Sequence, residues 1–419
     1  MDTARRSAAP WLPNAIGIAL LVGGVLVAWV RAQRGNDYAV IHAMAVGVAT
    51  HTNVYLLNDP GAVGEGVVGM VYPPATAFAV LPLAFMPFQV GRAVWFLIMN
   101  ATLVLGVRSL LRFVVPRSAP HVWLISAGLL LFSAAVRWGM MLLQGAPFML
   151  GLLCFFVPAF VAGRPRLTLA LAILATAFKM TLALPFVGLL LLRRRIGAAA
   201  VVVAVWLALN ALGFWCMGNG AFATYRHNVA IFEALGVPGN INGPDPWLGV
   251  SLPRLDWVFL FYGVTGNLPL ARLGNVACSA LVALWLLREG LRVRAPLSLS
   301  TTTLFLTPLV CLGSLCVYHH QYDIALFFVP VLLTYFGSLE LRKPTWALAL
   351  GLPLALIVAL LPIGAVQHVI EITLGSHWVG LLKLSFPVAI TLALAGSLAL
   401  LRQHLAELGR ASAMSSLAR

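Results

Sequence analysis

Charged side chains, and acidic ones above all, are scarce in this chain. Only 9% of its 419 residues are charged, whereas soluble globular proteins average about 25%. Only 12 residues are acidic, and no hydrophilic stretch is long enough to form a large soluble domain. Hydrophobic residues make up 61% of the chain, and the mean hydropathy is +0.96. This composition predicts an all-α polytopic membrane protein.

Cysteine, lysine and internal repeats are also sparse or absent. The five cysteines have no CxxC spacing, so the sequence indicates neither a disulfide framework nor a metal site. Without a basic soluble domain, nucleic acid is not expected as a partner. No internal repeat is found, which disfavours a transporter built from inverted repeats.

Apolar runs of spanning length recur from end to end and predict a single membrane domain over residues 1–419, with about 11–13 transmembrane helices. The run at 167–192 fits either one long tilted helix or two half-helices that meet at Lys179. The predicted spans are 11–31, 74–90, 92–113, 121–137, 146–163, 167–192, 196–217, 255–269, 271–288, 301–318, 322–339, 345–365 and 377–401.

The net charge of +15 comes mostly from arginines in short loops, which is typical of positive-inside topology and of contact with membrane lipids. Arg5 and Arg6 before the first span favour a cytoplasmic N-terminus. The hydrophilic loops at 32–73 and 218–254 then face outward, and we expect a multi-pass cell (inner) membrane protein with its active site on the periplasmic side. Three arginines do not fit this alternation: Arg108, Arg112 and Arg117.

Asp37 is a rare carboxylate in the first hydrophilic loop. It is interpreted either as a helix cap or as a general base that removes a proton from a bound hydroxyl, and the two roles are compatible. Tyr38 and Tyr55 follow it in the same loop. Tyr72 precedes two prolines, which fix the chain where it enters the membrane.

Lys179 lies inside an apolar run, where an ammonium group is costly and indicates a function or a paired partner. Either it snorkels from the end of a half-helix, or it is a fixed cation for a lipid-linked phosphate. Pro185 favours a broken helix, whose unpaired amides would also attract an anion. Gln144 begins another span, as an interfacial anchor or as a hydrogen-bond donor to a headgroup or sugar.

Another dense polar cluster runs from Tyr318 to Asp323 and contains His319 and His320. Adjacent histidines do not share a helix face, so HExxH-type metal geometry is absent. A histidine and Asp323 are spaced to pair, and the cluster is either an interfacial anchor or a phosphate-contacting imidazole. The loop at 218–254, with its asparagines, aromatics and Arg254, suits sugar recognition but is equally typical of any outward loop.

These residues, taken in order, resemble the integral-membrane GT-C glycosyltransferases, in particular glycosyltransferase family 87. That group contains the mycobacterial phosphatidylinositol-mannoside mannosyltransferase. The resemblance covers about residues 11–340. The motifs that carry it are Asp37-Tyr38, Tyr72-Pro73-Pro74, Trp95, Gln144-Gly145, Lys179 with Pro185, and Tyr318-His319-His320.

The resemblance implies a GT-C bundle that moves a sugar, mannose in the first place, from a polyprenyl-phosphate donor to a hydroxyl acceptor. Transfer would occur with inversion on the extracytoplasmic face, with Asp37 as general base. The acceptor would be a glycolipid, a polysaccharide or a protein, and neither a cofactor nor a metal would be required. The donor phosphate would be bound by Lys179, His319, His320 and Arg254. The substrate-binding residues would be Tyr38, Tyr55, Tyr72, Gln144, Asn242, Tyr318 and Asp323.

Two other functions fit the same sequence. A transporter or flippase for a lipid-linked or small polar solute would use the intramembrane lysine and the histidines as a substrate pathway. A non-catalytic assembly protein of an envelope complex would need none of these polar residues, and so explains them least.

Overall fold

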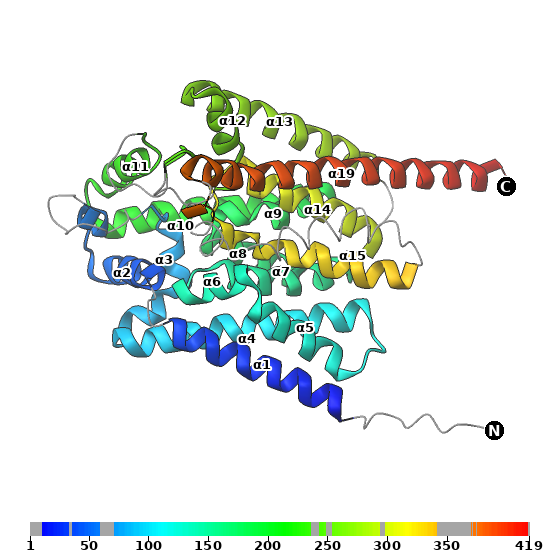
Figure 1. Ribbon diagram of the computed structural model, residues 1–419, viewed down its shortest axis with the longest axis horizontal. Coiled ribbons are helices and arrows are strands. Elements are labelled where there is room, and N and C mark those ends of the chain that lie inside the picture. Colours follow the sequence, from blue (N-terminus) through cyan, green and yellow to red (C-terminus); the bar gives the residue numbers. More distant parts are fainter. Residues whose placement is uncertain are drawn as a thin grey trace.

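The computed structural model describes residues 11–32, 36–58, 71–235, 243–248, 254–293, 298–341, 370, 372–373 and 375–417. These residues form a helical bundle in which the long helices lie roughly side by side, and the first described helix begins at the same end of the bundle at which the last one finishes (Figure 1). The predicted span at 345–365 and the candidate residue Asn242 lie outside the described residues.

Six helices among the described residues are long and apolar enough to cross a membrane, and the bent pair α5 (Pro120–Phe132) and α6 (Ala134–Leu142) makes up to seven. This confirms a polytopic, membrane-embedded protein. The number is smaller than the 11–13 expected, because several apolar runs form short helices. The six are α1 (Leu12–Arg31), α4 (Phe88–Val114), α10 (Ile196–Met217), α13 (Leu268–Arg292), α14 (Leu299–Cys316) and α19 (Ser376–Leu417).

The predicted span at 74–90 is one such case. It forms α3 (Ala75–Val80) and the 3₁₀ turn η3 (Leu81–Phe85), and a new helix, α4, begins at Phe88. Pro82 and Pro87 stand at these two junctions, where each removes a backbone donor that a continuous helix would need. The segment is therefore too short to cross a membrane.

Close contacts between glycines and side chains fix the direction of α1 and α5. A Cβ atom on Gly17 would lie 2.6 Å from Leu124 Cβ, and one on Gly24 would lie 2.7 Å from Leu131 Cβ. The two helices are therefore parallel, packed through small residues as membrane helices often are. Because α5 begins where α1 begins, α4 must end there too. This explains the arginines at the end of α4, which did not fit the predicted alternation.

The predicted span at 167–192 is a helical hairpin and not a single crossing. It consists of α8 (Pro165–Phe178), the short turn η4 (Met180–Leu182) and α9 (Leu184–Leu192), with Lys179 at the break. Arg193, just after α9, donates a hydrogen bond to the carbonyl of Phe160 near the end of α7 (Ala146–Val161), which leads into α8. Both ends of the hairpin therefore lie at one end of the bundle, and its tip lies inside it.

Most of the remaining short elements, α15 excepted, lie toward the other end of the bundle (Figure 1). The predicted loop at 32–73 contains a helix, α2 (Asn36–Thr50), and the turn η2 (Val54–Asn58), which packs on α11 (Ala221–Phe232). The helix α12 (Trp257–Thr265) is too short to be the predicted span at 255–269. After α14 the chain forms the turn η5 (Gln321–Phe327) and α15 (Phe328–Leu341), which replace the predicted span at 322–339.

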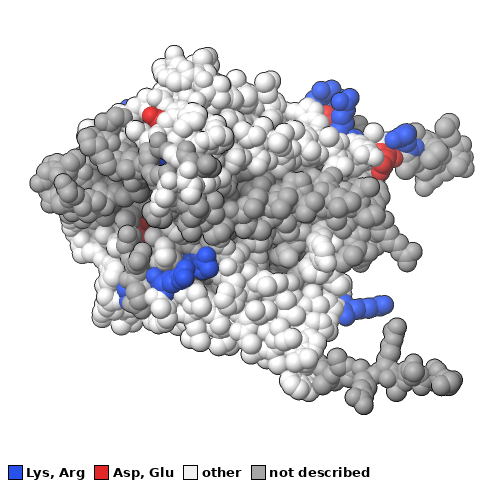
Figure 2. Space-filling model, in the orientation of Figure 1, with Lys and Arg blue, Asp and Glu red and all other residues white. Residues whose placement is uncertain are grey.

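Charge is unevenly distributed over the surface. The face in Figure 2 is mostly uncharged, with Lys and Arg side chains gathered at the end where α13 and α19 finish, and a smaller group nearer the other end. Arginine also connects helices at the end where α13 and α19 finish: Arg194, after α9, donates to the carbonyl of Leu291, near the end of α13. The end of the bundle at which α1 begins is thus rich in arginine.

Candidate active site

A buried ion pair joins the hairpin tip to the segment after α14. Lys179 Nζ lies 2.7 Å from Oδ1 of Asp323, and Oδ2 of the same carboxylate accepts from His319 Nδ1 at 2.9 Å. Burial raises the pKa of Asp323, but Lys179 and His319 outweigh it and lower the pKa to about 2. Asp323 is therefore a carboxylate held between two donors. The predicted pairing of a histidine with Asp323 is confirmed.

Lys179 reaches this position because α8 must end before Pro185. Pro185 has no backbone N–H, and its ring would clash with the carbonyl of Thr181, so α8 cannot continue through this segment. Lys179 ends α8 with an extended backbone, at φ −148° and ψ 86°. The hydroxyl of Thr76, in α3, donates to the carbonyl of Phe178 at 3.0 Å and holds the tip against that short helix.

The histidines are held by a short extended segment. His320 forms an antiparallel bridge with Arg254, and the amide of Leu255 donates to the carbonyl of His319 at 3.1 Å. Arg254 is buried, and two of its nitrogens bind the carboxylate of Asp256 at 2.8 and 3.0 Å. Its guanidinium also lies over the ring of Tyr318, whose hydroxyl hydrogen-bonds His320 Nε2.

Gln144 and Tyr72 form another side of the site. Gln144 accepts from the amide of Ala146 at 2.8 Å, and its Nε2 donates to the Tyr72 hydroxyl at 3.4 Å. Burial raises the pKa of Tyr72 well above 10, and the charges of Asp37 and Asp323 raise it further. Tyr72 therefore keeps its proton, lies within electrostatic reach of both carboxylates, and can donate to a third group.

Two of the tyrosines predicted to bind substrate are fully buried and contact other parts of the protein. Tyr55 is fully buried and donates to the Tyr72 carbonyl at 2.9 Å, so it positions its neighbour. Tyr38 is also fully buried, with its ring against His42 and Phe88. A Cβ atom on Gly91 would lie 2.3 Å from the Tyr38 hydroxyl, so this phenol points into the packing between α2 and α4.

Asp37 lies in the first turn of α2, outside the helices of spanning length, where the helix dipole favours a carboxylate. Burial raises its pKa from 3.8 to about 6, while Lys179 lowers it and Asp323 raises it. Asp37 is therefore within electrostatic reach of the ion pair. Among the described residues, no hydrogen bond or ion pair engages its carboxylate. The helix-end role and the general-base role stay compatible.

Comparison with known families decides the class of the protein. The model of glycosyltransferase family 87 matches residues 70–314, more than half of the chain. The chain belongs to glycosyltransferase family 87. No curated protein matches it at a significant level. The chain is thus a membrane glycosyltransferase, an enzyme that transfers a sugar from a donor to an acceptor.

The family 87 match covers only part of the site. It includes Tyr72, Gln144, Lys179 and Arg254, whereas Asp37 and the cluster 318–323 lie outside it. The structure connects these parts, because Asp323 pairs with Lys179 and Asp37 lies within electrostatic reach of both. Within the described part of this glycosyltransferase, no three His, Cys, Asp or Glu side chains are grouped to hold a metal ion.

Several supporting residues of the family 87 site were not anticipated from the sequence. Asp256 binds Arg254 and also caps α12 by accepting from the amide of Phe259 at 3.1 Å. Asn210 of α10 accepts from the amide of Ala75 at 3.0 Å and so holds the start of α3. The position of Asp256, two residues from Arg254 in a chain with few acidic residues, could have predicted their pairing. The contact of Asn210 could not be predicted in this way, because it joins residues 135 apart in the chain.

Proposed function

We propose that this enzyme transfers mannose from a polyprenyl-phosphate donor to an acceptor hydroxyl on the extracytoplasmic side of the cell membrane, with inversion. The observation that carries the proposal is the position of Asp37. Its carboxylate is unengaged among the described residues and lies within electrostatic reach of the ion pair between Lys179 and Asp323. A base and a fixed cation near one another are what transfer from a phosphate leaving group requires.

The distribution of arginine supports the proposed side of the membrane. Arginine-rich turns lie at the end of the bundle where α1 begins, and such ends face the cytoplasm in most membrane proteins. Asp37, at the start of α2, follows α1 and therefore lies toward the opposite end (Figure 1). The inferred active site accordingly faces the periplasm or its equivalent, where a donor made on the cytoplasmic face arrives after being flipped.

In the proposed reaction, the acceptor oxygen attacks the anomeric carbon of the donor sugar. The bond from that carbon to the phosphate oxygen breaks, and its electron pair leaves with polyprenyl phosphate. Asp37 takes the hydroxyl proton, and a single displacement inverts the anomeric centre. The pKa of about 6 suits this role, because a base works best when its pKa is near the working pH.

Lys179 and His320 are proposed to stabilise the departing phosphate. Lys179 has three donor hydrogens and uses one on Asp323, and its side chain is 11% exposed, so it can still reach a ligand. Because a monophosphate carries limited charge, protein cations suffice in this scheme and no metal is invoked. Arg254 is instead assigned to holding the histidine segment, since two of its guanidinium nitrogens donate to the carboxylate of Asp256.

His319, Asp323 and Tyr318 are proposed to position the groups that touch substrate. Tyr72 and Gln144 are proposed as sugar contacts, because the Tyr72 phenol keeps a proton to donate. Mannose and the polyprenyl carrier rest on the resemblance to a group that contains a mannosyltransferase. The acceptor is proposed as a glycolipid, polysaccharide or protein of the same membrane surface.

The rival function is a transporter or flippase for a lipid-linked or small polar solute. The intramembrane lysine and histidines suit a polar pathway as well as a catalytic site. However, Lys179 is tied to Asp323 at the closed tip of a hairpin, which favours a fixed site over a continuous pathway.

The test uses the purified protein in nanodiscs with a panel of short-chain polyprenyl-phosphate sugars and a membrane extract as acceptor. We expect label to transfer from the mannose donor, with inversion seen by NMR of the product. The Asp37→Asn variant should bind donor but lose transfer by about 10²–10⁴-fold. Full transfer by that variant excludes Asp37 as base, and no transfer by folded wild type with any donor favours the transporter.

A further inference from the structure

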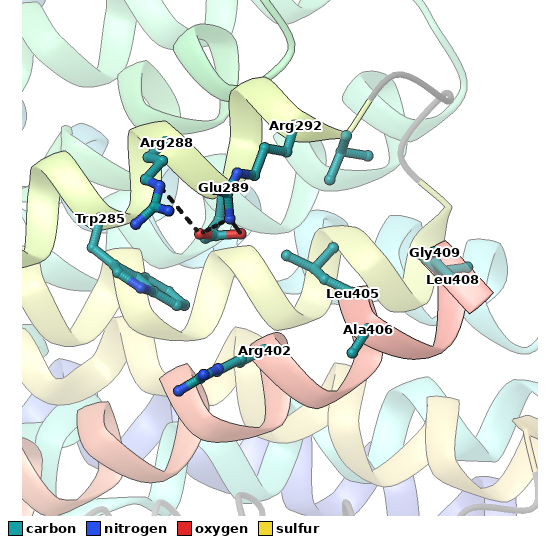
Figure 3. Close-up of a pocket in the computed structure, with 10 residues that line it drawn as sticks. Trp285, Arg288, Glu289, Arg292, Arg402, Leu405, Ala406, Leu408 and Gly409 are labelled. Carbon is teal, nitrogen blue, oxygen red and sulfur yellow. Dashed lines mark hydrogen bonds and ion pairs between the residues drawn. The ribbon is translucent and has the colours of Figure 1, made fainter. Parts of the chain in front are cut away.

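A cavity lies between α13 and α19, far from the proposed active site. Its volume is about 950 Å³, and its walls come from the last turns of α13 and the C-terminal half of α19 (Figure 3). On α13, Asn275 donates to the carbonyl of Cys316 beside the active-site segment. The cavity residue Glu289 is fourteen residues further along, or about 20 Å at the rise of an α-helix. The cavity is therefore a separate site at the arginine-rich end.

The polar part of the cavity is positively charged. Glu289 is held on α13 by Arg292 at 2.9 Å and by Arg288 at 4.0 Å, and Arg402 lines the cavity from α19 (Figure 3). Two guanidinium groups therefore flank the carboxylate, and a third, that of Arg402, lines the cavity from the other helix. No ion pair to Arg402 is present among the described residues. Guanidinium groups bind phosphate oxygens in pairs of parallel hydrogen bonds, so the excess charge suits a phosphate.

The rest of the cavity is apolar, and exposed apolar side chains lie next to it. Trp285 and Leu405 line it from the two helices, and Leu408 beside them is 45% exposed. On α13, the nearby Leu284 is 64% exposed, as expected of a surface covered by acyl chains. A tryptophan beside arginines at the end of a spanning helix marks the level of lipid headgroups. An inorganic phosphate would use the arginines alone and leave this apolar wall unfilled.

We propose that this cavity binds one anionic phospholipid. Arg288, Arg292 and Arg402 hold its phosphate, and an acyl chain lies along Trp285 and Leu405. Both α13 and α19 pack on α14, whose far end leads into the histidine segment of the active site. The lipid therefore joins two helices that the protein itself connects through α14.

Native mass spectrometry of the delipidated protein tests the proposal, with dioleoylphosphatidylglycerol and dioleoylphosphatidylcholine added in turn. We expect wild type to retain phosphatidylglycerol in preference to phosphatidylcholine. Arg402→Gln should weaken retention about tenfold, the loss expected for one charged hydrogen-bond contact. Arg410→Gln is the matched control: this exposed arginine lies on α19 but does not line the cavity, and its loss should change nothing.

A second variant tests the apolar part without changing charge. Ala406→Trp fills the cavity from α19 and should reduce phosphatidylglycerol retention as much as Arg402→Gln does. Glycerol phosphate, which has no acyl chains, should bind neither the variants nor the wild type. Equal retention by wild type, Arg402→Gln and Ala406→Trp overturns the proposal. Binding of glycerol phosphate or inorganic phosphate as tight as that of the lipid also overturns it, because the site would then recognise a soluble anion.

Discussion

Lys179 and Asp323 form an ion pair at 2.7 Å although 144 residues separate them in the chain. The pair fastens the tip of the α8–α9 hairpin to the segment after α14, and it also aligns His319 through the second carboxylate oxygen. The exposed side-chain fractions are 11% and 3%. Removing either partner leaves an unpaired charge in a poorly solvated site. The resulting loss of folding free energy is far larger than the net stabilisation that the pair provides.

The first prediction concerns this pair. Lys179→Met and Asp323→Asn should each destabilise the protein by about 3–5 kcal/mol, the usual cost of leaving one charge of a buried pair uncompensated. The double variant should recover most of that stability and yet remain inactive, because the phosphate contact is lost. Thermal unfolding in detergent and the transfer assay measure the two effects. Stability losses that simply add in the double variant contradict the pairing.

The second prediction concerns pH. Because burial raises the pKa of Asp37 to about 6, kcat/KM should rise with pH and level off above that value. Lys179 lowers this pKa and Asp323 raises it. The rise of kcat/KM with pH should therefore move to higher pH in Lys179→Gln and to lower pH in Asp323→Asn. The pH profile of residual single-turnover transfer measures both. Arg272→Gln is the control, because Arg272 belongs to an exposed ion pair with Glu233, and it should leave the rise of kcat/KM at the same pH. Shifts of the same sign in both active-site variants contradict the assignment.

The third prediction concerns stability. A carboxyl group whose pKa is raised on folding favours the folded state only while it is protonated, so its contribution is lost as pH rises from about 4 to about 6. Asp37→Asn removes this dependence, and its melting temperature should exceed that of wild type increasingly from pH 4 to pH 7. The free-energy gain is at most about 3 kcal/mol, and less because the side chain is partly exposed. A gap that stays constant with pH shows that Asp37 titrates normally.

The sequence predicted the class of fold and the polar groups more reliably than the path of the chain between them. Rare charges in an apolar chain are conspicuous, so Asp37, Lys179 and Asp323 were all identified, and the break at Lys179 was one of two alternatives. Hydropathy does not separate a crossing from a re-entrant hairpin, because both are equally apolar. The hairpin follows from Pro185 together with the distant contact between Arg193 and Phe160.

The roles of the buried tyrosines illustrate the same limit. Tyr38 follows Asp37 directly, and the family resemblance placed it among the substrate-binding residues. Successive residues of a helix point in directions about 100° apart, so Tyr38 is fully buried while Asp37 stays partly exposed. The order of such residues can be read from the sequence, but only the close approach of Gly91 to the phenol shows where the Tyr38 side chain points.

The last prediction concerns Gly145, which follows Gln144. A Cβ atom there would lie 1.9 Å from Phe178 Cε1, so Gly145→Ala must push the α7 start away from the hairpin tip that carries Lys179. Transfer should fall by up to about 10²-fold, the effect of misplacing catalytic groups by about 1 Å, with a loss of about 1–3 kcal/mol in stability. Gly197→Ala on α10 is the matched control, since nothing lies within 4 Å of its Cβ position. The double variant Gly145→Ala/Phe178→Leu makes room for the new methyl group and should regain part of the activity. If Gly145→Ala is as active as Gly197→Ala, the spacing of Gln144 and Lys179 is not what limits transfer.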